Sequence, residues 1–297
     1  MITRRNWVFS TLAVTGQFVF GGRSGRAYEG ARLAAFERQL AELEKASGGR
    51  LGVAFLDTGS GVRGGHRADE RFPMCSTFNL LLAGAVLARV DRHQEDLSRM
   101  VHFTREQMVA YSPVTETRVG DRGITVAELC AAAVTQSDNT AANLLLDSIG
   151  GPKGLTAFVR SIGDEVTRLD RREPELNEAL PGDPRDTTTP AAMVSSLRKL
   201  VLGDALSEAS RMQLTEWLVQ NKTGDKRIRA GLPAGWKVGD KTGTGTRGTA
   251  NDVAIFWPAG RAPVLLAVYL TGATVDADHQ NDLIASVARG LVGTLQG

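Results

Sequence analysis

The sequence predicts a two-lobe fold, α/β plus all-α, in which an antiparallel sheet flanked by terminal helices carries an inserted helical lobe. Strand-like alternation occurs near both ends of the 297-residue chain, at residues 50–72 and 236–273. The stretch between them has helical periodicity. The two ends are therefore expected to share one sheet, with a cleft between the lobes as the place for a site. The α/β lobe is expected at residues 28–70 and 220–297, and the helical lobe at residues 71–219.

Residues 1–27 are predicted to be a signal peptide. A short basic start, MITRRN, precedes the apolar stretch WVFSTLAVTGQFVFGG, whose polar interruptions do not suit a membrane span. Arg4 and Arg5 ahead of this stretch are compatible with twin-arginine export, and Gly25 and Ala27 are small residues suited to a cleavage site. We expect an exported protein, periplasmic or secreted, with no stable membrane insertion after processing. An uncleaved apolar N-terminal helix is the alternative.

The remaining elements follow from periodicity and glycine placement. GARLAAFERQLAELEKASG predicts an amphipathic helix over residues 30–47, and RLGVAFLDTGSGVRGGHRADERF predicts two adjacent strands. Helical runs such as LLLAGAVLARV and AAMVSSLRKLVLG fill residues 76–220. Strand character returns in GWKVGDKTGTG, NDVAIFWPAG and APVLLAVYLTGA, and HQNDLIASVARGLVGTLQ predicts a closing helix.

Composition excludes several function classes. The net charge of +2, with 42% hydrophobic and 23% charged residues, is ordinary for a globular protein and too small to indicate a nucleic-acid partner. Cys75 and Cys130 both lie in apolar surroundings, so two buried free thiols are expected rather than a disulfide. The four histidines show no paired ligand spacing, so neither a metal nor another cofactor is expected. We expect a monomer.

Four short segments carry residues suited to chemistry. In chain order they are STFN (Ser76 to Asn79), SDN (137–139), REPELNEA (172–179) and KTG (241–243). Each alone has a structural interpretation: a Ser-Asp-Asn tripeptide is a good helix N-cap, and Lys-Thr-Gly is typical of a strand entering a turn. Their order and spacing together are specific.

With these four segments, the chain resembles the class A serine β-lactamases. The flanking stretches YSPVTE, AELCAAAVTQSDNTAANLLL and LDRREPELNEA extend the resemblance, which covers nearly the whole chain after the signal. It implies the two-lobe fold, a small-molecule β-lactam as substrate, and hydrolysis of penicillins or cephalosporins through an acyl-enzyme.

The resemblance also implies a role for each matching residue. Ser76 matches the nucleophile at a helix N-terminus, and the backbone N–H groups of Ser76 and Thr244 match the oxyanion hole. Glu173 matches the carboxylate that activates the deacylating water. The other matches are Ser137 (proton transfer to the leaving nitrogen), Lys241 (polarising Ser137), Asn177 (holding the water) and Asn139 (binding the substrate amide).

Further residues are expected to bind substrate or to shape the site. Thr242, Gly243 and Thr244 follow the motif lysine and offer two hydroxyls. Arg227 is expected to bind the substrate carboxylate, with a surface arginine as the alternative. The remaining expectations are Tyr111 at the cleft mouth, or merely packed, and an Arg171–Asp186 pair that closes the loop around Glu173.

Asn79 is where the chain departs from the family pattern, which has lysine there. Asparagine forms hydrogen bonds but does not titrate or carry charge, and general base help is worth about 10²- to 10⁴-fold. Glu173 acting on Ser76 through a water is one way for acylation to survive. Three hypotheses stay open: a slowed serine β-lactamase, a protein that captures β-lactams or peptidoglycan fragments without turnover, and a penicillin-binding-type peptidase. The EPELN stretch disfavours the third.

Overall fold

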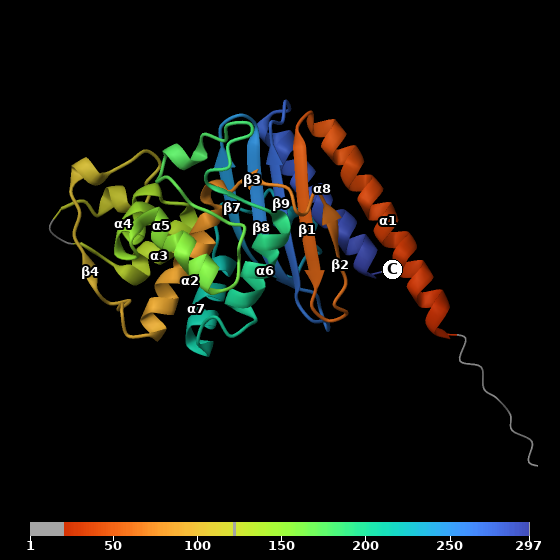
Figure 1. Cartoon of the computed structure of the whole chain (residues 1–297), viewed down its shortest axis with the longest axis horizontal. Coiled ribbons are helices and arrows are strands. Elements are labelled where there is room, and N and C mark those ends of the chain that lie inside the picture. Colours follow the sequence, from red (N-terminus) through yellow and green to blue (C-terminus); the bar gives the residue numbers. More distant parts are fainter. Residues whose placement is uncertain (1–20, 121–122, 297) are drawn as a thin grey trace, which may run out of the picture.

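The computed structural model describes residues 21–120 and 123–296. Its centre is a five-stranded antiparallel sheet in the order β2-β1-β9-β8-β7 (Figure 1). The strands are β1 (Arg50–Asp57), β2 (Arg63–His66), β7 (Lys237–Gly245), β8 (Thr249–Trp257) and β9 (Val264–Thr271). Strands from both ends of the chain pair directly, because β1 lies against β9 over its whole length. The prediction that the two ends share one sheet is confirmed.

The two terminal helices cover one face of this sheet. Helix α1 (Gly21–Ser47) and helix α8 (Ala277–Gln296) lie side by side on the outer face of the sheet (Figure 1). They pack an apolar cluster against the strands, in which the rings of Phe36 and Phe55 meet edge to face at 5.9 Å. Helix α1 begins at Gly21, nine residues before the predicted start at Gly30. The sequence did not predict this earlier start because the glycines at 21, 22 and 25 have low helix propensity.

The other face of the sheet packs against the helical part of the chain. Helix α2 (Phe78–Asp91) is buried from Phe78 to Ala88, as expected for a helix that is apolar on all sides. Around it lie α3 (Val126–Gln136), α4 (Asn139–Ser148), α5 (Gly151–Ser161), α6 (Pro190–Val201) and α7 (Glu208–Val219) (Figure 1). Because α2 is fixed on every side, the residues at its N-terminal end have fixed positions as well.

Short elements connect these parts. Strand β3 (Phe72–Pro73) pairs with β6 (Thr187–Thr188), and β4 (Met100–Val101) pairs with β5 (Ile124–Thr125). The 3₁₀ turns are η1 (Cys75–Thr77), η2 (Arg105–Gln107), η3 (Thr115–Thr117), η4 (Glu175–Asn177) and η5 (Ile228–Gly231). The β3–β6 pair joins the segment before Ser76 to the end of the loop that carries Glu173.

Most of the predicted signal peptide, residues 1–20, lies outside the described residues, and the rest forms the first turns of α1. Within the described part of the chain, no helix has the length and apolar character needed to span a membrane. Cys75 and Cys130 are buried free thiols, as predicted, and burial raises the pKa of both.

Candidate active site

Ser76 lies in η1, immediately before α2, and its side chain is buried at the base of the cleft. Cys75 has a positive φ of 45°, which turns the chain sharply at the point where the serine enters the helix. The Ser76 hydroxyl donates a hydrogen bond to Glu173 Oε1 at 3.4 Å. The serine and the carboxylate, 97 residues apart in sequence, are therefore direct neighbours.

Two glycines let β7 approach this turn closely. A Cβ on Gly243 would lie 2.7 Å from the Met74 carbonyl oxygen, and one on Gly245 would lie 2.7 Å from Cys75 Sγ and 2.8 Å from the Asn177 carbonyl oxygen. Real Cβ atoms do not approach other atoms this closely, so glycine is required at both positions. Thr244, between them, is thereby held beside the Ser76 segment.

The SDN segment is built around a structural aspartate. Asp138 caps α4 by accepting from the Ala141 N–H at 2.8 Å, and it also accepts from the backbone N–H groups of Val114 and Thr115 at 2.9 Å. Ser137 ends α3 in the left-handed conformation, with φ 55°. Asn139 donates to the Ala110 carbonyl at 2.9 Å. The N-cap interpretation is correct for Asp138, while Ser137 and Asn139 line the cleft.

Lys241 is fully buried beneath Ser137. Its amine donates a short hydrogen bond to Ser137 Oγ and a second bond, of 2.8 Å, to the Thr242 carbonyl. Burial lowers the pKa of Lys241 to about 7, although the charges of Asp240, Asp252 and Glu173 act in the opposite direction. This amine is therefore close to its titration point at neutral pH.

Glu173 is almost completely buried, with 2% of its surface exposed. Burial raises its pKa to about 7, against hydrogen bonds from Asn177 and Ser76 and the charge of Lys241, which favour the carboxylate. Asn177 Nδ2 donates a short hydrogen bond to Glu173 Oε2, while Ser76 is bonded to the other oxygen. A carboxylate with a pKa near 7 suits a general base.

A cavity of about 590 Å³ opens above these groups. Arg227, 8% exposed, donates from Nη2 to Thr244 Oγ1 at 2.7 Å and from Nη1 to the Gly243 carbonyl at 2.8 Å. Because Arg227 lines the cavity and also donates to the Asn251 carbonyl and to Asn281 Oδ1, the surface-arginine alternative is wrong. Tyr111 lines the mouth and is 61% exposed, so it does not pack into the core. The cavity is lined by Ser76, Tyr111, Ser137, Asn139, Asn177, Lys222, Thr223, Arg227, Thr242 and Thr244.

Comparison with known proteins identifies the family. A sequence model of the β-lactamase enzyme family matches residues 35–295. Beta-lactamase AST-1 of Nocardia asteroides is 54% identical over 257 residues, covering 86% of this chain and 83% of that protein. The carbapenem-hydrolyzing beta-lactamase KPC of Klebsiella oxytoca is 54% identical over 251 residues, covering 84% and 85%. A solved ancestral class A beta-lactamase is 69% identical, with a TM-score of 0.86, over 87% of this chain and 99% of that chain. The chain belongs to the class A β-lactamase family.

Asn79, the residue that departs from the class A motif, is buried without a hydrogen-bond partner among the described residues. It is the second residue of α2 and has no exposed surface. Neither its Nδ2 nor its Oδ1 has a hydrogen-bond partner among the residues that the structure describes. An unpaired buried polar group costs about 1 to 3 kcal/mol, and such groups are concentrated at functional sites. The buried Asn79 amide therefore lowers the free energy of unfolding.

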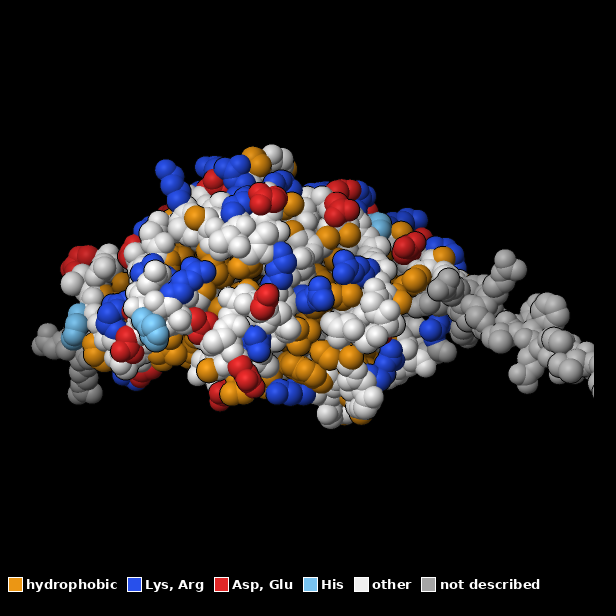
Figure 2. Space-filling view, turned by 60° about the horizontal axis from the view of Figure 1, so that its bottom comes forward, with side chains coloured by type: hydrophobic (Ala, Val, Ile, Leu, Met, Phe, Trp, Pro, Cys, Tyr) orange, Lys and Arg blue, Asp and Glu red, His pale blue; other side chains and the backbone are white. Residues whose placement is uncertain are grey.

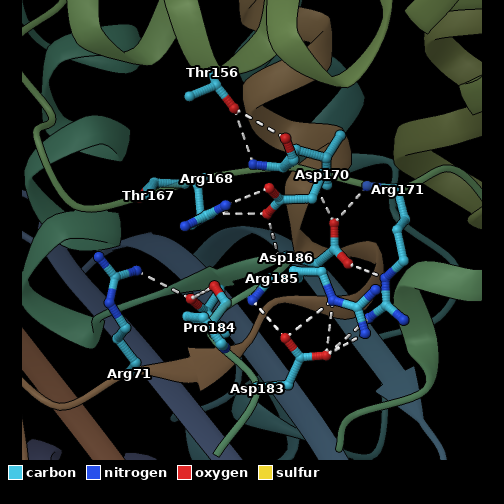
Figure 3. A network of polar contacts seen from close by, with 12 residues as sticks. Arg71, Thr156, Thr167, Arg168, Asp170, Arg171, Asp183, Pro184, Arg185 and Asp186 are labelled. Atoms are coloured by element: carbon cyan, nitrogen blue, oxygen red, sulfur yellow. Dashed lines mark hydrogen bonds and ion pairs between the residues drawn. The ribbon is translucent and has the colours of Figure 1, made fainter.

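The loop that carries Glu173 in this β-lactamase is closed at its neck by the predicted pair. Arg171 Nε donates to Asp186 Oδ2 at 2.6 Å, while Asp186 Oδ1 accepts from the backbone N–H groups of Asp170 and Arg171 (Figure 3). Asp186 is 1% exposed, and its carbonyl accepts from the Met74 N–H, two residues before Ser76. The Arg171–Asp186 prediction is confirmed, and the pair ties the loop to the nucleophile segment.

Arg171→Ala is expected to lower the free energy of unfolding by about 3 kcal/mol, because it leaves the Asp186 carboxylate buried without its cation. Urea titration is the measurement. Arg185→Ala is the matched control: Arg185 pairs with Asp183 in the same network but is 44% exposed, so a loss below about 1 kcal/mol is expected (Figure 3). Equal losses in the two variants would contradict this account of the neck.

Two positioning residues were not predicted. Asn143, on α4, donates to the Glu173 carbonyl at 2.9 Å and accepts from the Glu173 N–H at 3.0 Å, which fixes the backbone of the carboxylate. Asn251, on β8, donates to the carbonyls of Pro73 and Met74 at 2.9 and 3.0 Å. The sequence signal that could have indicated them is a single asparagine beside an apolar run, as in TAANLLL and NDVAIF.

Proposed function

We propose that this protein is a serine β-lactamase that hydrolyses the β-lactam amide of penicillins and cephalosporins through an acyl-enzyme on Ser76. The observation that carries the proposal is the direct hydrogen bond from Ser76 to a buried Glu173 whose pKa is about 7. Because residue 79 is an asparagine, Glu173 is the group positioned to accept the serine proton. One carboxylate thus serves both steps of the reaction.

In acylation, the Ser76 oxygen attacks the β-lactam carbonyl as its proton passes to Glu173. The backbone N–H groups of Ser76 and Thr244 stabilise the oxyanion, at roughly 3 to 4 kcal/mol for such a donor. Asn139 binds the substrate's amide side chain. The substrate carboxylate is bound by the hydroxyls of Thr242 and Thr244 together with Arg227, whose guanidinium is bonded to Thr244. The ring nitrogen leaves beside Ser137.

In deacylation, Glu173 removes a proton from a water that attacks the acyl carbon. Asn177, bonded to the second carboxylate oxygen, holds this water beside Glu173. Neither a protein that only captures β-lactams nor a penicillin-binding-type peptidase needs a carboxylate that activates water against the acyl group. The Glu173 loop therefore favours hydrolysis over both alternatives.

A second candidate function is the capture of β-lactams or peptidoglycan fragments without turnover. The unpaired Asn79 amide favours it, because no titratable group stands at that position. Mixing the protein with a chromogenic cephalosporin separates the candidates. Continuous turnover supports the β-lactamase, one stoichiometric burst supports capture, and no reaction contradicts both.

The proposed partner is a small-molecule β-lactam, and the protein acts as a monomer. Basic and acidic side chains are interspersed over the face shown in Figure 2, so this face has no extended positive field of the kind that binds nucleic acid. With a net charge of +2, long-range steering of a polyanion is not expected.

We expect export and loss of the signal peptide, so that the mature chain begins after about residue 27. The basic start followed by an apolar stretch supports this prediction. Intact-mass measurement on periplasmic material is the check, and a variant with Arg4 and Arg5 changed to lysine tests the twin-arginine route. A full-length product retained in the cytoplasm would contradict the prediction.

A further inference from the structure

A second cavity, of about 500 Å³, is lined by the end of the loop that carries Glu173. Among the described residues, it shares no lining residue with the cavity above Ser76. Its walls come from segments far apart in sequence: residues 48–50 at the start of β1, Arg71 and Pro73 at β3, residues 179–184 of the loop, Arg247 between β7 and β8, and residues 271–272 at the end of β9. A ligand in this cavity would touch the loop without entering the catalytic cleft.

Two arginines of this second cavity have uncompensated positive charges. Arg71 donates from Nη1 to the Val166 carbonyl and to Thr187 Oγ1, both at 3.0 Å, and both acceptors are neutral (Figure 3). Arg247 is exposed and, like Arg71, forms no ion pair with any residue in the described part of the chain. Guanidinium groups bind carboxylates and phosphates through paired N–H donors. The two side chains are therefore available to an anionic ligand.

The other charged groups that line the second cavity are already paired. Arg50 donates to Glu70 at 2.7 Å, and its guanidinium lies 4.5 Å from the centre of the Phe72 ring. Asp183 is the one acid among the described lining residues, and it accepts from Arg185 Nη2 at 2.7 Å. Hydrogen bonds from Arg185 hold the pKa of Asp183 at about 2, so this carboxylate stays charged and compensated. The positive charges of the two unpaired arginines are therefore not cancelled within the cavity.

The remaining side chains of the second cavity are mainly apolar. Pro73, Ala179, Leu180 and Pro181 contribute carbon surface to its wall. The volume of about 500 Å³ lies in the range of pockets that hold organic molecules and exceeds what a bare inorganic anion would fill. Apolar surface beside two unpaired guanidinium groups suits a ligand with a carbon body and acidic oxygens.

We propose that this cavity is a second binding site, which takes a small organic dianion such as a phosphate monoester, and that the bound anion holds the Glu173 loop closed. The acidic oxygens bind Arg71 and Arg247, and the carbon body packs on Leu180 and Pro181. The site lies outside the catalytic cleft, so its occupation does not depend on the proposed β-lactamase activity.

The two arginines connect the anion to different parts of the loop. Arg71 is bonded to Thr187, where the loop ends in β6. Arg247 follows Thr246, whose N–H donates to the Asn177 carbonyl at 2.9 Å. The site is complete only while these segments are together, so a ligand that binds it stabilises the closed loop by mass action. At ten times its Kd, the ligand should lower the open fraction of the loop about tenfold.

The test uses phenyl phosphate as the probe, with phenol and inorganic phosphate for comparison. At about pH 8 the phosphate group is a dianion, because its second pKa is about 6. In amide NMR spectra we expect saturable shifts at residues 48–50, 182–183 and 272, with a Kd of about 1 mM or lower. Hydrogen exchange of residues 177–187 should slow about tenfold at ten times the Kd. Phenol should cause no saturable shifts, and inorganic phosphate should bind at least about threefold more weakly.

Arg247→Gln is the decisive variant, because this side chain has no ion pair in the described part of the chain whose loss would destabilise the fold. We expect it to weaken the binding of phenyl phosphate about tenfold or more. Arg71→Gln should have a similar effect, and urea titration checks that this variant is folded. Arg105→Gln is the matched control: Arg105 is an exposed arginine in η2 that does not line the second cavity, and its loss should leave the Kd unchanged.

Several results would overturn the inference. Shifts confined to the amides of Ser137, Lys241 and Thr244 would place the anion in the catalytic cleft instead. Equal affinities of the parent and Arg247→Gln, or no saturable shift at about 20 mM phenyl phosphate, would exclude the second site. Equal affinities for phenyl phosphate and inorganic phosphate would exclude an organic ligand. Binding at the second cavity without slower exchange of residues 177–187 would overturn its link to the loop.

Discussion

Replacing Glu173 with glutamine is expected to lower kcat for a penicillin by about 10³-fold or more, roughly 4 kcal/mol of barrier. Glutamine has nearly the same size, and its amide oxygen still accepts the hydrogen bond from Asn177. Glutamine does not accept a proton, and in this chain the same carboxylate bonds to Ser76 and to Asn177, the residue proposed to hold the attacking water. Both acylation and deacylation should therefore slow in the parent protein.

The two steps separate in the Asn79→Lys background. There an amine beside Ser76 can assist acylation, so Glu173→Gln should block mainly the release of the acyl group. Mass spectrometry after mixing with a penicillin should show the adduct persisting on Ser76. Glu175→Gln is the control, because Glu175 is an exposed acid two residues away. Unchanged turnover in Glu173→Gln would remove this residue from the mechanism.

The pH dependence of turnover follows from the same carboxylate. Burial raises the pKa of Glu173 to about 7, so the base is mostly protonated at pH 6 and mostly ionised at pH 8. Turnover limited by deacylation should therefore rise with pH through about 7. The surroundings that set this pKa come from segments far apart in sequence: Ser76 in η1, Asn143 on α4 and Lys241 on β7. Local sequence does not contain that information.

The sheet was predictable because its strands carry strong local signals. Runs such as VAIFW and LLAVYL are continuously apolar and contain β-branched and aromatic residues, and turn-forming prolines and glycines follow or precede them within a few residues. Helix α2 was predictable from its unbroken apolar run. The start of α1 was not, because its glycines weaken the helical signal while packing on α8 and the sheet supports the helix that follows.

The site was predictable in its residues but not in its geometry. Motif order named Ser76, Ser137, Glu173 and Lys241, and all four meet at one cleft. The left-handed conformation of Ser137 and the backbone contacts of Asn143 arise from tertiary packing, as does the missing partner of Asn79. The sequence shows that asparagine replaces the motif lysine at residue 79. Only the structure shows that the Asn79 amide has no hydrogen-bond partner there among the described residues.

Asn79 should behave as a residue that costs stability. Asn79→Met removes two buried unpaired polar atoms and places a longer apolar side chain at a buried position in the first turn of α2. We expect the free energy of unfolding to rise by about 1 kcal/mol, since the desolvation penalty of the amide is lost while the larger side chain must still be accommodated. Urea titration measures the change. A marked loss of stability would mean that the amide has a compensating role.

Asn79→Lys is expected to raise kcat/KM for a penicillin by about 10²-fold or more, roughly 2.7 kcal/mol of barrier. The new amine would lie beside Ser76 and within the field of Glu173, and it offers a second proton route to the nucleophile. Its positive charge favours the carboxylate form of Glu173, so the pKa of Glu173 should fall and the acid limb of the pH profile should move below about 7. Asn79→Met, similar in length to lysine but without an amine, is the control and should bring no gain. Pre-steady-state acyl formation is the quantity to measure, because the gain belongs to acylation. If Asn79→Lys acylates no faster than the parent, then Asn79 does not limit acylation in this chain and the prediction is wrong.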